Sequence, residues 1–67
     1  MPKIVEQGWH EIDGERFQWT YDDDGLVEVS HPVYGSKTTQ KGGLEAEQVA
    51  LLLASELNKA GQTGGSE

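Results

Sequence analysis

The sequence predicts an α+β fold, in which an antiparallel β-meander of three to four strands is packed on one face by a single C-terminal α-helix. Two patterns carry this prediction. Residues 1–43 hold alternating polar and apolar runs between glycine-containing turns, which is typical of strands. Residues 44–60 are rich in helix-forming residues, with apolar positions at helical spacing. We assign residues 1–60 to one small domain and residues 61–67, which have no apolar side chain, to a disordered tail.

The most regular strand is expected at Arg16–Tyr21, where Phe17, Trp19 and Tyr21 alternate with polar residues. A second strand follows at Leu26–His31 and ends before a proline. A three-residue loop over 23–25 would place Trp19 opposite Val29 and Tyr21 opposite Val27. These aromatic and β-branched side chains then share one face of the sheet.

The first turn sets the position of Trp9. A three-residue loop, Ile12-Asp13-Gly14, places Trp9 opposite Phe17 on the aromatic face. A two-residue Asp13-Gly14 loop would instead place His10 opposite Phe17 and turn Trp9 to the other face. Because it gathers the large aromatic side chains together, we predict the three-residue loop and a core that includes Trp9.

Two further segments extend this sheet. Residues 33–40 are β-prone and predict a fourth strand at an edge, although Pro32 leaves its regularity open. Ile4-Val5 either lengthens the first strand or forms a short pairing of its own.

The helix is expected over residues 44–60, with Gly61 as its C-terminal cap. Its packed face should hold the apolar positions Ala46, Val49, Ala50, Leu52, Leu53, Leu57 and Ala60. Leu44 and Leu51 lie nearly opposite that face. The helix should therefore cover the aromatic side of the sheet and leave these two leucines free.

Composition excludes several classes of function. Twelve acidic and five basic residues give a net charge of −7, which disfavours nucleic acid and anionic membranes as partners. The absence of cysteine excludes disulfides and cysteine-based zinc sites. No apolar run has the length of a membrane span, so we expect a cytoplasmic protein.

No catalytic, metal or cofactor site is predicted. The sequence has no nucleophile–base set, HExxH motif or phosphate-binding glycine motif. Asp22-Asp23-Asp24-Gly25 resembles the start of a calcium loop, but a turn accounts for it. In the register above, His31 lies on the face of Phe17 and His10 on the opposite face, so the imidazoles do not converge. We therefore expect no enzyme.

The leading hypothesis is a protein-interaction or regulatory module. Its partner surface would comprise Leu44 and Leu51 on the helix with Tyr34, Lys37 and Lys41 near the last strand. The partner is another protein or a second copy, which would make a homodimer. The alternative is a nucleic-acid-associated protein that contacts phosphate through Lys37–Lys41.

Overall fold

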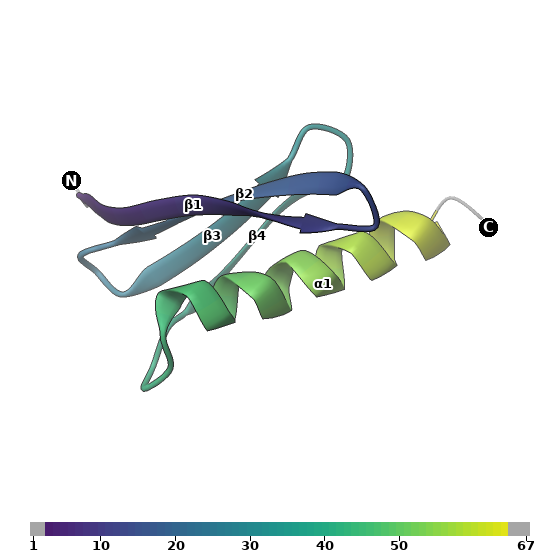
Figure 1. Ribbon diagram of the computed structural model, residues 1–67. Helices are drawn as coiled ribbons and strands as arrows, with labels where there is room; N and C mark the ends of the chain where they lie inside the picture. Colours follow the sequence, from purple (N-terminus) through teal and green to yellow (C-terminus); the bar gives the residue numbers. More distant parts are fainter. Residues whose placement is uncertain (1–2, 65–67) are drawn as a thin grey trace.

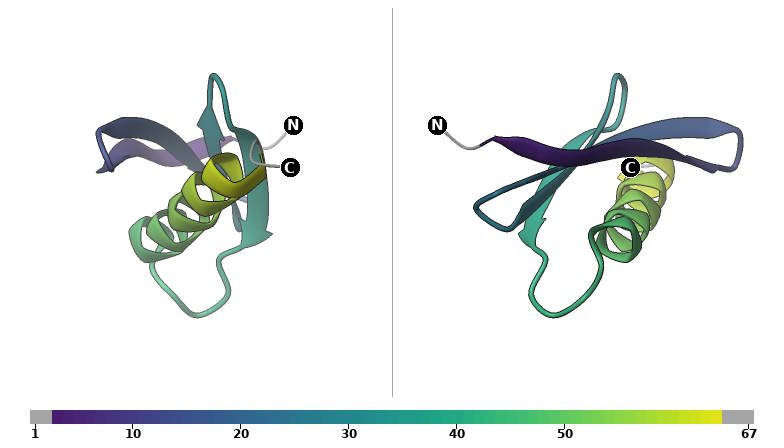
Figure 2. Two further views of the ribbon diagram at one scale, coloured as in Figure 1. Left: turned by 90° about the vertical axis from the view of Figure 1, so that its right-hand side faces the viewer. Right: turned by 60° about the vertical axis from the view of Figure 1, so that its left-hand side comes forward.

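The computed structural model describes residues 3–64 and confirms the predicted α+β fold (Figure 1). In this part of the chain the elements are β1 (Ile4–Ile12), β2 (Glu15–Asp22), β3 (Leu26–His31), β4 (Gly35–Gln40) and α1 (Ala46–Gly64). The strands form one antiparallel sheet in the order β1-β2-β3-β4. Figure 2 shows α1 lying along one face of the twisted sheet. Within the described residues, no helix combines the length and apolar character needed to cross a membrane.

The core lies between this face of the sheet and α1. The sheet contributes Phe17, Trp19, Val27 and Val29, all buried, as the sequence predicted. Tyr21 is partly buried and packs at the margin. The helix contributes the buried apolar side chains Ala46, Val49, Ala50, Leu53, Ala54 and Leu57.

The first turn differs from the prediction, and Trp9 differs with it. Ile12 pairs with Glu15, so the loop is the two-residue Asp13-Gly14 turn, with φ angles of 54° and 80°. Such turns need positive φ at both positions, and Asp-Gly suits them because their twist matches that of the strands. His10 therefore pairs with Phe17 and faces the helix, whereas Trp9 is 51% exposed on the other face. Turn chemistry outweighed the hydrophobic pattern.

The second turn agrees with the prediction. Trp19 pairs with Val29 and Tyr21 with Val27. The carboxylate of Asp22 accepts hydrogen bonds from the backbone N–H groups of Asp24 and Leu26, each at 3.0 Å. The aspartate run thus forms a turn that is stabilised by hydrogen bonds from the following backbone N–H groups to an aspartate side chain.

The remaining strand predictions are resolved. The fourth strand is regular over Gly35–Gln40 and lies at an edge, as expected. Ile4 and Val5 extend β1, with a register shift between Ile4 and Glu6.

The helix begins later and ends later than predicted. It starts at Ala46 and runs through Gly61 to Gly64, so Gly61 is not its cap. Gly61 instead provides room for an aromatic ring, because a Cβ there would lie 2.5 Å from Cδ1 of Tyr34. Residues 65–67 of the predicted tail lie outside the described residues.

The packed face of α1 is also rotated from the prediction. Leu52 is 58% exposed and Ala60 is exposed, while Ala54 and Asn58 are buried in their place. Asn58 is held by its Nδ2, which donates to Asp13 Oδ2 at 2.8 Å. Leu51 is exposed, as expected. The Asn58 side of the helix thus lies against the first turn of the sheet.

Candidate functional site

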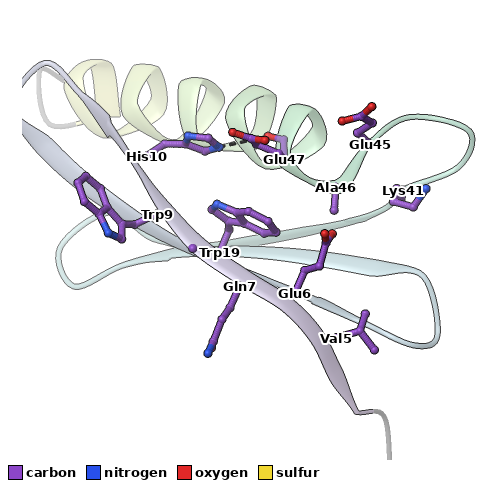
Figure 3. Close-up of a pocket in the computed structure, with 11 residues that line it drawn as sticks. Val5, Glu6, Gln7, Trp9, His10, Trp19, Lys41, Glu45, Ala46 and Glu47 are labelled. Atoms are coloured by element: carbon purple, nitrogen blue, oxygen red, sulfur yellow. Dashed lines mark hydrogen bonds between the residues drawn. The ribbon is translucent and has the colours of Figure 1, made fainter.

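A groove of about 800 Å³ lies between β1 and the start of α1 (Figure 3). We call it the β1–α1 groove. Its lining includes Glu6, Gly8 and His10 from β1, Trp19 from β2, Lys41 from the connecting loop, and Glu45 and Glu47 at the start of the helix. The strand register explains this set, because Glu6, Gly8 and His10 pair with residues that face α1.

Trp19 lies along the floor of the groove and is 7% exposed. Its ring lies against Gly8, where an added Cβ would be 3.1 Å from the indole Nε1. Glycine at this position therefore lets the indole approach the backbone of β1. Among the described residues no hydrogen bond engages the indole N–H. The N–H is not one of the fully buried polar atoms that lack a partner, so it is open to the groove.

His10 and Lys41 lie at opposite ends of the groove (Figure 3). The His10 ring stacks on Trp19, with ring centroids 6.1 Å apart, and its Nε2 donates to the Glu47 carbonyl at 3.2 Å. Lys41 Nζ donates to the Leu44 carbonyl at 2.7 Å. Both side chains are thus engaged within the protein and join neighbouring segments.

The charge of the groove is negative. Glu6, Glu45 and Glu47 are exposed carboxylates. The ion pairs His31–Glu15 and Lys37–Glu56 are formed by other residues. The three groove carboxylates have no cationic partner within residues 3–64, and Lys41 is bonded to main-chain carbonyls.

An unpaired strand edge runs beside the groove. β1 pairs with β2 on one side only. The two-residue turn makes Ile12 and Glu15 a hydrogen-bonded pair, and main-chain groups then alternate in direction along the strand. This alternation directs the N–H and C=O groups of Gln7, Trp9 and Glu11 outward, where a further strand could pair with them.

The structure does not bring the sequence-predicted partner residues together at the groove. Leu44 is exposed just before α1 begins, and Leu51 is exposed on α1. Lys37 pairs with Glu56 at 2.9 Å, and Tyr34 stacks on His31 with centroids 4.4 Å apart. Lys41 alone among the five lines the groove.

His31 is on the face of Phe17, as predicted, and has a structural environment. It is buried, and its Nδ1 accepts hydrogen bonds from the N–H groups of Val33 and Tyr34 at 3.0 and 3.1 Å. Its Nε2 lies 2.9 Å from Glu15 Oε1. The described residues include no group of three or more potential metal-ligating side chains.

The sequence interpretation missed Glu6, Gly8 and His10 as groove residues. It placed His10 on the outer face because it assigned the longer first turn. The Asp13-Gly14 dipeptide was the available signal, since it favours a two-residue hairpin loop.

Comparisons with known proteins add no relative. No protein-family model, curated protein or solved structure matches this chain.

Proposed function

We propose that this protein is an interaction module that binds an extended segment of a partner protein along β1. The segment would add a strand to the sheet and lie over the β1–α1 groove. The observation that carries the proposal is the unpaired edge of β1 beside a groove with Trp19 on its floor. We propose binding rather than catalysis. We also propose a cytoplasmic location, with which the absence of cysteine is compatible.

Strand addition accounts for the exposed apolar surface of β1. In this mode the main chain supplies hydrogen bonds, and alternate side chains supply specificity. Ile4, Val5 and Trp9 are large apolar side chains exposed on this one strand. A bound segment would cover part of that surface on the outer face and reach the groove on the helix face.

A homodimer through the helix is the second candidate. Leu51 and Leu52 are exposed on the side of α1 that does not contact the sheet, and Leu44 is exposed just before the helix begins. Leu51→Glu should then convert a dimer to a monomer in gel filtration with mass detection. A wild-type protein that is monomeric at high concentration would contradict this candidate.

The nucleic-acid alternative receives less support. Lys37 is paired with Glu56, and Lys41 is bonded to the main chain. Both cations thus have partners within the protein, and the net charge of −7 opposes approach of a phosphate backbone.

Two proline variants test the main proposal. Gln7→Pro removes an outward N–H from β1 without removing a bond to β2. Thr38→Pro is the matched control on β4. There the bond from Lys41 N to Gly25 O shows that Lys41, Thr39 and Lys37 face β3, so Thr38 faces outward.

A displayed library of random peptides would be selected on the wild-type protein, and the affinities of enriched peptides then measured by fluorescence anisotropy. We expect about a tenfold loss with Gln7→Pro, corresponding to roughly 1.4 kcal/mol, and little change with Thr38→Pro. Unchanged affinity in Gln7→Pro, or no enriched peptide, would overturn the proposal. Amide spectra of both variants check that the fold is retained.

A further inference from the structure

We infer that the segment received at β1 is basic, with a Lys or Arg side chain that enters the β1–α1 groove. This inference rests on the function proposed above and adds the chemistry of the partner. It is carried by two features of the groove, namely the Trp19 ring that lies against Gly8 on its floor and the carboxylates around that floor.

The space in the groove lies where a long side chain would enter. Side chains of a strand added to β1 alternate between the two faces of the sheet, so every second one points toward α1. Gly8 has no side chain on that face, whereas its neighbours Glu6 and His10 do. The Trp19 ring lies against Gly8 there, so a partner residue opposite Gly8 meets this ring on the floor of the groove.

The groups around this space favour a cation. Glu6 lies on the strand side, Glu45 lies just before the helix, and Glu47 lies in its first turn (Figure 3). Lys41 also lines the groove, but its Nζ donates a hydrogen bond to the Leu44 carbonyl. A lysine or arginine head group would thus meet carboxylates that have no other cationic partner in the described chain.

Trp19 adds a hydrogen-bond donor to the groove. Its indole is more than nine-tenths buried, and its N–H, which lies beside Gly8, has no acceptor within residues 3–64. A side-chain oxygen of an incoming peptide that points toward α1 can accept this hydrogen bond, because main-chain carbonyls of an added strand lie in the plane of the sheet. This bond would add to the attraction of opposite charges but does not itself select a cation.

The same charges disfavour a second copy of this chain at β1. Each copy carries a net charge of −7, and two paired β1 strands would bring both sets of groove carboxylates together. A basic segment is instead attracted at long range, and its binding should weaken as salt screens that attraction.

Three capped peptides of equal length would test this inference, with alternating Thr-Lys, Thr-Gln and Thr-Glu sequences. Each would be titrated against the wild-type protein and two charge variants at low salt, with backbone amide shifts as the readout. The groove variant is Glu6→Gln with Glu45→Gln. The matched control, Asp24→Asn with Glu28→Gln, changes two exposed carboxylates that do not line the groove and gives the same net charge.

We expect the Thr-Lys peptide to bind most tightly, with about a fivefold loss in the groove variant and a smaller loss in the control. Equal losses in the two variants would contradict a local role for the groove. If the Thr-Gln peptide binds as tightly as Thr-Lys and is weakened by Gln7→Pro, the partner chemistry is wrong but strand addition stands. If no peptide binds, or if Gln7→Pro has no effect on any of them, strand addition fails as well.

Discussion

The two edges of this sheet contrast in chemistry. β4 has no large apolar residue, every residue in it is exposed, and Lys37 joins it to Glu56 on α1. β1 carries exposed Ile4, Val5 and Trp9 and borders the β1–α1 groove. Charged and polar edges resist pairing with other chains, whereas apolar edges invite it. One sheet thus protects one edge with polar and charged residues and leaves the other edge available for pairing.

A histidine near each edge gives the largest expected contrast. His31 is buried against Phe17 and Tyr34, with ring centroids 4.8 and 4.4 Å away, and accepts two backbone hydrogen bonds. His31→Ala should lower the free energy of unfolding by about 3 kcal/mol, because it removes packing and leaves backbone donors unsatisfied.

His10→Ala is the matched variant beside β1. Its ring is half-buried and makes one hydrogen bond, at 3.2 Å, so the expected loss is about 1 kcal/mol. Urea denaturation measures both values. Equal losses in the free energy of unfolding would show that the two histidines stabilise the fold equally, which would contradict the expected difference between the two sides of the sheet.

Two glycines make the next comparison. Gly61→Ala would place a Cβ 2.5 Å from the Tyr34 ring, whereas Gly8→Ala would place one 3.1 Å from Trp19 Nε1. Overpacking at Gly61 costs about 1–3 kcal/mol, and the helix propensity of alanine returns about 1 kcal/mol. We expect a net loss of about 1 kcal/mol for Gly61→Ala and a smaller one for Gly8→Ala in thermal unfolding. The reverse order would contradict the tighter packing beside Tyr34.

The Lys37–Glu56 pair should show the smallest effect. Both side chains are largely exposed, at 47% and 60%, so solvent screens their 2.9 Å contact. A double-mutant cycle with Lys37→Ala and Glu56→Ala should give a coupling of about 0.2–1 kcal/mol that falls with added salt. A coupling well above this range would mean that the ion pair fixes β4 to the helix.

Much of the fold could be predicted from the sequence, for identifiable reasons. The pairing of Trp19 with Val29 followed from strand alternation and a three-residue turn. The predicted placement of Trp9 in the core was wrong. The preference of Asp13-Gly14 for a two-residue loop competed with the hydrophobic pattern and prevailed. A local turn preference decided which face a whole strand presents.

The groove could not be predicted in the same way. It depends on where the first turn of α1 lies relative to Gly8, which is a tertiary distance that periodicity does not encode. The exposure of Leu52 has a similar origin, because it depends on how α1 is rotated against the sheet when its apolar residues pack and Asn58 contacts Asp13. Sequence patterns identified the layers of the fold but not the space between them.

The most direct test of the central claim is a map of backbone amide shifts during titration with the Thr-Lys peptide. If β1 is the binding edge, the largest shifts will fall on its outward amides, at Gln7, Trp9 and Glu11, and on the start of α1. The outward amides of β4, at Ser36, Thr38 and Gln40, should remain in place. Shifts concentrated on β4, or around Leu51 and Leu52, would contradict the assignment of β1 as the interaction edge.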